Sequence, residues 1–384
     1  MLTRSILAWR LTEQATALAT INLVVAVPML LVSMLGGTIT DRVERRQLVV
    51  FGQCFLLGNE ALILTLLLTE QLQFWHIMCA GLITGCVLPF IMPARTAITA
   101  DVVGPEELQS AIAYTSSLIN LSRISGPALM GLVISGFEII GAYTLSIMLY
   151  SVAVACMLGV DRNRPHHSKK SEQTLMSDMV SGFRYLVKNR PVLICLLFGL
   201  LPMLLAMPFK NLLVMLAEQV WALGEPGVGT LMAVSGVGGV LGSIWIIRRG
   251  NSPNRLTLMF YSTLAFGICL AVFSRTESFY LALPPLLAAT TFASAAQTIN
   301  NASIQLLVDD EFRGRMSSLM MMSFGLTPIG VFPMALVADQ IGSANAIFGA
   351  CIILVIATVG FYLLSPTLRR LDQSIEMRLA KASK

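Results

Sequence analysis

One arginine of this chain lies inside a long apolar stretch. Arg123 stands near the middle of residues 111–136, and Ser116 and Asn120 precede it at helical spacing, so the three side chains share one helix face. A cation in the hydrocarbon of a bilayer costs at least about 2.5 to 3.5 kcal/mol unless it faces a cavity or a partner. We therefore expect Arg123 either to attract an anionic group or respond to a proton, or to be held by carbonyl groups and Asn120.

A second polar stripe occurs late in the chain. It consists of Ser294, Gln297, Asn301 and Gln305, which recur on one face of an expected helix. Inside a membrane, such a stripe is expected to face a bundle of helices. There it either contacts a substrate or forms interhelical hydrogen bonds.

Two further charged residues interrupt apolar stretches. Lys210 lies near the outer end of its stretch, where it either meets an anionic substrate or reaches the outer interface. Glu60 could take part in proton coupling, because burial favours the protonated form of a carboxyl group. The favoured interpretation of Glu60 is that its side chain snorkels toward the outer surface.

Helices that cross a membrane must position these residues. The chain of 384 residues is 55% hydrophobic and only 12% charged, which is too apolar for a soluble protein. Lipid offers no partners to an open backbone, so each apolar stretch long enough to span the hydrocarbon must be helical. The sequence contains eleven such stretches, at residues 15–39, 48–68, 74–94, 111–136, 140–160, 192–215, 226–247, 256–273, 278–304, 317–338 and 343–364.

The basic residues indicate how these helices are oriented. Most of the 26 Lys and Arg residues fall in alternate loops and in the C-terminal tail. Because short cytoplasmic loops collect positive charge, these loops and the tail are expected to be cytoplasmic. The net charge of +5 therefore indicates topology and not a nucleic-acid partner.

The chain contains an internal repeat. Arg45 and Arg46 have counterparts in Arg248 and Arg249, and residues 106–108 have counterparts in residues 310–312. The shift in residue number from the first copy to the second is nearly the same for both pairs. Parallel repeats of this kind are typical of transporters that surround a central site. The predicted organisation is an N-terminal bundle at 1–160, a cytoplasmic linker with an amphipathic helix at 161–191, a C-terminal bundle at 192–364 and a cytoplasmic tail at 365–384. In the linker helix, Phe183 and Val187 are expected on the apolar face.

A small-residue face is expected in the second bundle. Its members are Ser235, Gly238, Gly239 and Gly242. Their spacing places them on one side of a helix, against which a neighbouring helix can pack or slide.

Residues 36–46, GGTITDRVERR, join an apolar stretch to a burst of charge. They resemble the signature loop between the second and third helices of the major facilitator superfamily, with the pattern G-x-x-x-D-R-x-G-R-R; Glu44 replaces a glycine. The matching residues are Gly37, Asp41, Arg42, Arg45 and Arg46. A carboxylate flanked by guanidiniums can lock a neighbouring helix end, and the resemblance implies that this lock holds the inward-closed state. An ordinary positively charged cytoplasmic loop is the alternative.

A second motif follows Arg123. Gly126, Pro127 and Gly131 resemble the G-P-x-x-G-G motif of the antiporter branch of the same superfamily, with Met130 in place of one glycine. Proline frees a backbone carbonyl and glycine allows close packing, so the helix can bend at a cavity. A plain packing kink explains these residues equally well.

The resemblance covers nearly the whole chain and is closest to the bacterial drug-and-siderophore exporter branch, which includes enterobactin and macrolide exporters. It implies a major facilitator fold and proton-driven export of small amphipathic molecules by a monomer in the bacterial inner membrane. A non-transporting remnant or a membrane scaffold is the alternative. An enzyme is disfavoured, because none of the three His stands beside a plausible nucleophile or metal set. We expect no catalytic residue, metal or cofactor.

The repeat also has an unmatched part. The counterpart of residues 192–215 would begin ahead of Met1, so residues 1–12 are expected to be only the outer end of a first helix. A misassigned start codon or a truncated gene is the preferred explanation. A genuine eleven-span protein is the alternative.

Overall fold

The computed structural model describes residues 2–40, 44–160, 184–249, 255–308, 326–369 and 371–373. At some helical positions only the backbone is described, and these positions include Ser116, Asn120 and Arg123. The predicted lock residues Asp41 and Arg42 lie outside the described residues, as do most of the predicted linker and the end of the tail.

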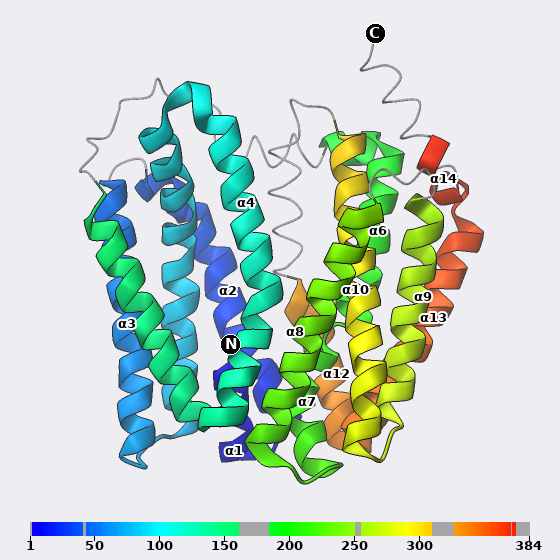
Figure 1. Ribbon diagram of the computed structural model, residues 1–384, viewed down its shortest axis with the longest axis horizontal. Helices are drawn as coiled ribbons and strands as arrows, with labels where there is room; N and C mark the ends of the chain where they lie inside the picture. Colours follow the sequence, from blue (N-terminus) through cyan, green and yellow to red (C-terminus); the bar gives the residue numbers. More distant parts are fainter. Residues whose placement is uncertain are drawn as a thin grey trace. The chain divides into compact units, whose positions relative to one another are not determined.

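Every regular element among these residues is a helix (Figure 1). The helices are α1 (Leu2–Thr12), α2 (Ala15–Thr40), α3 (Arg45–Leu68), α4 (Phe74–Leu158), α6 (Arg190–Leu205), α7 (Phe209–Gln219), α8 (Gly224–Arg249), α9 (Arg255–Ser274), α10 (Phe279–Leu307), α12 (Thr327–Ile341), α13 (Ser343–Leu364) and α14 (Pro366–Arg369). The all-α membrane fold expected from the sequence is confirmed.

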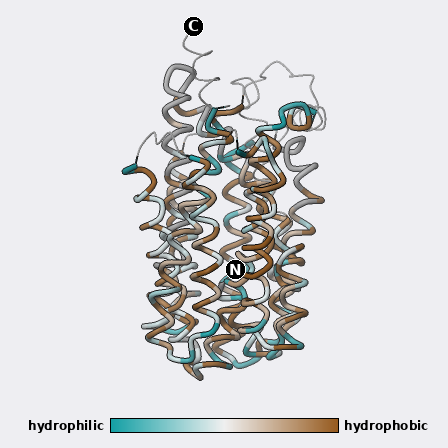
Figure 2. The backbone as a smooth tube through the Cα atoms, turned by 90° about the vertical axis from the view of Figure 1, so that its right-hand side faces the viewer, coloured by the Kyte–Doolittle hydropathy of each residue, from teal (hydrophilic) through white to brown (hydrophobic). Residues whose placement is uncertain are grey.

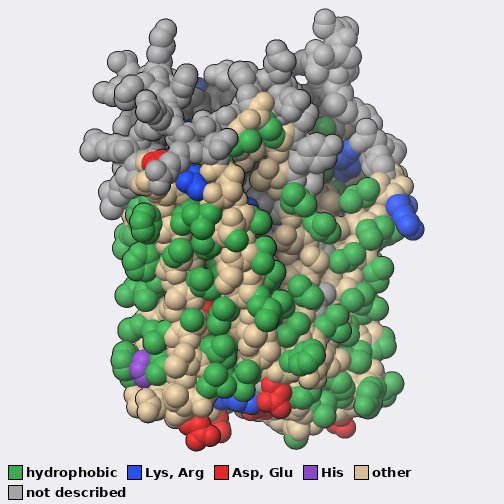
Figure 3. Space-filling model, turned by 60° about the vertical axis from the view of Figure 1, so that its left-hand side comes forward, with side chains coloured by type: hydrophobic (Ala, Val, Ile, Leu, Met, Phe, Trp, Pro, Cys, Tyr) green, Lys and Arg blue, Asp and Glu red, His purple; other side chains and the backbone are tan. Residues whose placement is uncertain are grey.

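Several of the described helices are long and apolar enough to cross a membrane. Eight stretches qualify by length and composition, and Ala15–Met29 and Thr327–Ile341 are shorter apolar helices. Hydrophobic residues follow the helices and hydrophilic ones gather toward their ends (Figure 2). On the face shown in Figure 3, hydrophobic side chains cover the sides of the helices, while most charged side chains lie near the ends.

The long element α4 contains three of the predicted spans. It is not a straight rod, because Glu138 within it has a φ of 57°, which a right-handed helix does not allow. Figure 1 shows its ribbon reversing direction. The predicted boundary between residues 136 and 140 therefore contains the residue at which the right-handed helical backbone is interrupted.

The predicted span at residues 192–215 lies within one candidate span, Arg190–Gln219, but its helix is interrupted, which corrects the expectation of a continuous helix. The helix α6 ends at Leu205 and α7 begins at Phe209. The amides of Ala206 and Met207 both donate to the Pro202 carbonyl, at 3.1 and 2.8 Å, and the intervening Pro208 has no amide hydrogen to continue a helical ladder. An apolar stretch long enough for one helix thus forms two.

The chain divides into two compact units. The first comprises residues 1–123 and 133–175, and the second comprises residues 124–132 and 176–384. Each unit is described by itself below.

The segments that precede and follow the membrane helices of the second unit pack onto its core. Residues 184–188 are helical, and Tyr185 and Leu186 are buried in a cluster that also contains Leu368 and Leu371 from the tail. Val187, expected on the apolar face, is 56% exposed. The buried face of this segment therefore differs from the predicted one, because it packs against the bundle.

Candidate functional site

An ion pair lies inside the first unit. Arg4 Nη2 of α1 and Glu60 Oε1 of α3 are 2.7 Å apart, and the two side chains are 3% and 13% exposed. Arg4 Nη1 also donates to Thr84 Oγ1 of α4, at 2.9 Å. One guanidinium therefore joins three helices.

Asn59 extends the polar contacts of this pair. Its Nδ2 donates to the Ala80 carbonyl at 3.0 Å and to Thr84 Oγ1 at 3.3 Å. Asn59 and Glu60 are neighbours on α3, while Ala80 and Thr84 are one turn apart on α4. The two helices thus place their polar residues on the faces that pack together.

The aromatic residue Tyr143 completes this site. It is fully buried and interacts electrostatically with both Arg4 and Glu60. Tyr150 interacts electrostatically with the same two charges. We call Arg4, Asn59, Glu60, Thr84 and Tyr143 the Arg4–Glu60 cluster.

The cluster is not fully satisfied by protein groups. The buried atoms Arg4 Nε and Asn59 Oδ1 have no hydrogen-bond partner among the described residues. A buried donor and a buried acceptor therefore remain available beside a carboxylate. Protonation of Glu60 would neutralise the carboxylate and leave the Arg4 charge without its counter-ion.

The ion pair corrects the favoured interpretation of Glu60. Its carboxylate does not snorkel to the surface but is held at Arg4. Arg4, in the expected outer end of the first helix, is buried. The pairing itself could not be predicted, since the two residues are far apart along the chain and belong to no shared motif.

Arg46 of the predicted lock binds the end of another helix. Its Nε donates to the Met157 carbonyl at 3.1 Å and its Nη2 to the Leu158 carbonyl at 2.5 Å. These carbonyls belong to the last turn of α4, where a cation complements the helix dipole. Of the other motif residues, Gly37 lies in α2 and Arg45 begins α3.

The predicted small-residue face of α8 lies against α10. A Cβ built at Gly238 would overlap Thr290 Oγ1, and one built at Gly242 would overlap the Thr291 carbonyl. Ser294 of the predicted stripe donates to the Gly239 carbonyl at 2.8 Å. The first residue of the stripe therefore forms an interhelical hydrogen bond.

The remaining stripe residues of α10 are placed differently from Ser294. Gln297 and Asn301 are exposed, whereas the neighbouring Asn300 is 7% exposed and its Oδ1 has no partner among the described residues. Asn300 packs at Gly199 of α6, where a Cβ would overlap its Nδ2. The structure thus buries an amide that the predicted stripe did not include.

For the other predicted residues, the structure gives the helix in which each lies and, for some, its exposure. Lys210 is exposed at the start of α7, and Ser235 is buried on α8. Gly126 and Gly131 lie in the part of α4 that groups with the second unit, as does Pro127. Among the described residues, no group of three or more His, Cys, Asp or Glu is arranged to hold a metal ion.

Solved structures of transporters share this fold. The nucleoside transporter NupG superposes with a TM-score of 0.68 at 12% identity, covering 95% of this chain and 97% of that one. A bacterial homologue of the human lysosomal transporter Spinster, in an inward-facing and unoccupied conformation, gives a TM-score of 0.65 at 13% identity, covering 98% and 95%. The fold is therefore the major facilitator fold.

Curated relatives include transporters of several small molecules. The staphyloferrin A transporter of Staphylococcus aureus is 24% identical over 94% of this chain and 91% of its own length. Macrolide efflux protein A of Streptococcus pyogenes is 26% identical over 80% and 76%. The enterobactin exporter EntS of Escherichia coli is 25% identical over 74% and 68%.

These findings define the class of the protein as a multi-pass membrane transporter of the major facilitator type. The chain belongs to the transmembrane secretion effector family, whose sequence profile matches residues 2–380.

Proposed function

We propose that this chain exports small amphipathic molecules, drug-like or siderophore-like, by alternating access driven by protons. The observation that carries the proposal is the family match over residues 2–380. Relatives named for export or efflux of a siderophore and of macrolides add support. The proposed setting is a monomer in the inner membrane of a bacterial cell, with its C-terminus in the cytoplasm.

The proposed roles follow the chemistry of each residue. In this proposal, residues around Asp41 and Arg46 form a conformational lock, and Glu60 exchanges the coupling proton. Small-molecule substrate or proton contacts are assigned to polar residues of the predicted pathway. These are Ser116, Asn120, Arg123, Lys210, Gln297 and Asn301.

Glu60 is proposed as the proton site because of its surroundings. Its carboxylate is mostly buried and has one cationic partner, Arg4. The phenols of Tyr143 and Tyr150 interact with the same carboxylate. A proton taken up by Glu60 breaks the ion pair that joins α1 to α3, so it changes the helix contacts of the first unit.

Export is tested with the full chain in cells. Energised cells expressing it should extrude a dye, a macrolide or a catecholate siderophore, and a protonophore should stop the extrusion. Arg123→Ala should abolish it, whereas Arg95→Ala, an exposed change on the same α4, should leave it intact. If no compound of the panel moves although the protein is inserted in the membrane, export of these classes is refuted.

Coupling is tested separately in proteoliposomes. Glu60→Gln keeps a carbonyl oxygen for Arg4 but cannot exchange a proton, so transport driven by a pH gradient should be lost while downhill movement of substrate continues. Glu70→Gln, an exposed change in the turn that follows α3, should behave as the unchanged chain. If Glu60→Gln still responds to the pH gradient, Glu60 is not the coupling site.

A further inference from the structure

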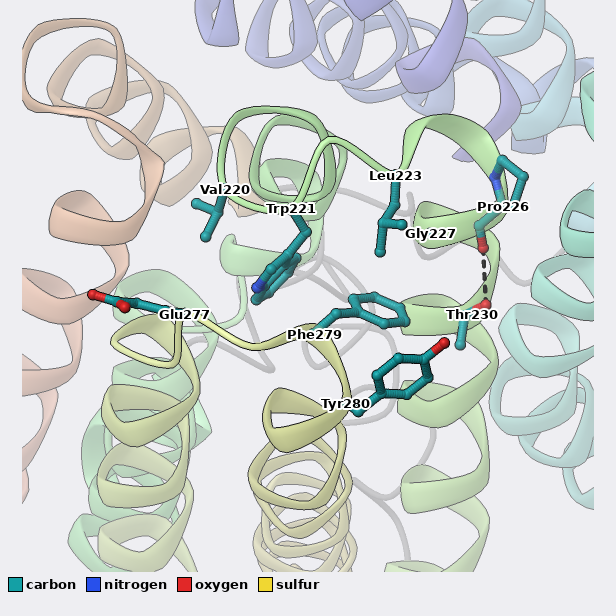
Figure 4. Close-up of a pocket in the computed structure, with 9 residues that line it drawn as sticks. All are labelled: Val220, Trp221, Leu223, Pro226, Gly227, Thr230, Glu277, Phe279 and Tyr280. Carbon is teal, nitrogen blue, oxygen red and sulfur yellow. Dashed lines mark hydrogen bonds between the residues drawn. The ribbon is translucent and has the colours of Figure 1, made fainter.

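A pocket of about 430 Å³ lies at one end of the second unit. It is formed by the link between α7 and α8 together with the link between α9 and α10. Its lining residues are Val220, Trp221, Leu223, Pro226, Gly227, Thr230, Glu277, Phe279 and Tyr280 (Figure 4). None of these residues belongs to the substrate or proton roles assigned above.

The two links that border this pocket have defined backbone conformations. Ala222 and Gly224 have φ values of 50° and 55°, so the chain between α7 and α8 turns sharply. Leu223 donates its amide to the Ala217 carbonyl at 3.1 Å, which fixes the turn to the end of α7. On the other side, Phe279 is the first residue of α10. The Phe279 ring is therefore carried by the N-terminal end of a helix.

Aromatic rings form one wall of the pocket. Trp221 is flanked by Phe273 at 5.9 Å and by Phe279 at 5.6 Å between ring centroids. Phe279 is in turn 5.7 Å from the ring of Tyr280. These contacts fix the Trp221 and Phe279 rings, while Tyr280 is 80% exposed. Tyr280 thus presents an open aromatic face to a ligand.

The charge of the pocket is negative. Glu277 is the acidic residue of the lining, and Figure 4 shows its carboxylate pointing away from the rings of Phe279 and Tyr280; Lys and Arg are absent from the lining. The nearby Arg275 is placed over the Phe348 ring, 4.1 Å from its centroid. Glu277 makes no ion pair with another described residue. The carboxylate is not directed at the rings, so it favours a cation over an anion through its negative charge near the pocket and not through a direct contact.

We propose that this pocket binds an organic cation, an ammonium group carrying an aromatic or alkyl body. The face of an aromatic ring attracts a cation, and the attraction is about 0.5 to 1 kcal/mol at exposed sites. An apolar body would fill the space along Leu223 and Pro226. The cation is either a free solute or the ammonium of a lipid headgroup, since both have this chemistry. The inference does not depend on transport.

Trp221 supplies the readout for a binding test. The chain has four Trp residues, so replacing the other three by Phe leaves Trp221 as the reporter in the full chain, reconstituted in nanodiscs of phosphatidylglycerol. Benzyltrimethylammonium should change its fluorescence saturably. Benzenesulfonate, an anion with the same ring, should bind at least several-fold more weakly. If the triple variant does not fold, the difference between the unaltered chain and Trp221→Phe gives the same readout.

Two variants locate the cation. Tyr280→Ala should weaken binding about two- to fivefold, as expected for one exposed cation–π contact. Glu277→Gln should weaken it by less than Tyr280→Ala does, because this exposed carboxylate points away from the rings and acts only through its charge. The matched controls are Tyr261→Ala and Glu70→Gln, which alter an exposed tyrosine and an exposed carboxylate outside the pocket.

The lipid composition distinguishes the two sources of the cation. Weaker binding of the probe in phosphatidylcholine nanodiscs identifies a lipid ammonium as a competitor, and unchanged binding identifies a free cation as the ligand. Both outcomes support the organic-cation site. The proposal is overturned if binding is not saturable, if the sulfonate binds equally well, or if neither pocket variant weakens binding.

Discussion

At the scale of single residues, Arg4 joins its own helix α1 to both α3 and α4 of the first unit. It contacts Glu60 at 2.7 Å and Thr84 at 2.9 Å while only 3% of its side chain is exposed. A buried ion pair gives little net stability over a hydrophobic pair, because both charges lose their hydration. Removing one partner is far more costly, since it leaves the other charge buried and unpaired.

The ion pair therefore predicts that the effects of replacing Arg4 and Glu60 on the free energy of unfolding are not additive. Glu60→Leu alone should lower the free energy of unfolding by about 3 to 5 kcal/mol, because it leaves the Arg4 charge unpaired. Arg4→Leu combined with Glu60→Leu should restore most of this loss. The measurement is reversible unfolding of the purified chain in mixed detergent micelles. Losses that simply add in the double variant would contradict the ion pair.

At the scale of elements, α8 and α10 are held close by glycine and small polar residues. Ser243 and Ser294 share a hydrogen bond of 2.8 Å across the two helices. The backbone of α10 lies where a side chain at Gly238 or Gly242 would be. Small-residue faces of this kind let helices in a membrane approach closely.

This packing predicts that Gly242→Ala is destabilising. The added methyl group would overlap the Thr291 carbonyl, and overpacking costs about 1 to 3 kcal/mol. That cost should exceed the gain of about 1 kcal/mol from alanine's higher helix propensity. Gly349→Ala on α13 is the matched control, because a Cβ there meets nothing within 4 Å and only the propensity gain remains. Equal unfolding free energies for the two variants would rule out close α8–α10 packing.

The contacts of Arg46 predict that Arg46→Lys loosens the C-terminal end of α4. Lysine has no planar fork, so Arg46→Lys should lose one of the two contacts to the Met157 and Leu158 carbonyls. Hydrogen exchange at the amides of the last turn of α4 should then become several-fold faster. Arg190→Lys, an exposed change on α6, should leave these amides unchanged. Unaltered exchange in Arg46→Lys would show that its contacts do not hold the helix end.

The helices could be predicted from the sequence more fully than their breaks and partners. Apolar length alone identified the stretches that form α3, α9 and α13, because lipid-facing helices have few other requirements. The break between α6 and α7 was missed although Pro202 and Pro208 were visible, since hydropathy measures length and not backbone hydrogen bonds.

The candidate site was harder to predict, because its contacts join distant residues. Glu60 could be singled out as a charge in an apolar stretch, but its partner Arg4 was assigned to an outward segment. Likewise, the 3.6-residue period identified Ser294 as a polar residue on one helix face. It could not tell whether the Ser294 hydroxyl would form a hydrogen bond to a neighbouring helix or contact a substrate. Periodicity gives the face of a helix, and only tertiary packing gives what that face meets.

At the scale of the whole molecule, the distribution of charge should determine the orientation in the membrane. The net charge of the chain is +5, and its basic residues were found mainly in alternate loops and in the tail. Short loops rich in Lys and Arg stay in the cytoplasm during insertion. In the second unit, α14 and the link between α9 and α10 lie at opposite ends (Figure 1), so labels at these two places report opposite sides of the membrane.

The orientation predicts which of two cysteines is reached from outside an intact cell. In a chain whose seven native Cys are replaced by Ala, Ser278→Cys and Gln373→Cys introduce one exposed thiol each. A maleimide that cannot cross membranes should label Ser278→Cys at once and Gln373→Cys only after permeabilisation, because a basic tail is retained in the cytoplasm. Labelling in the reverse order would place the tail outside. It would also put the aromatic pocket on the cytoplasmic side, where an organic cation would have to reach it from within the cell.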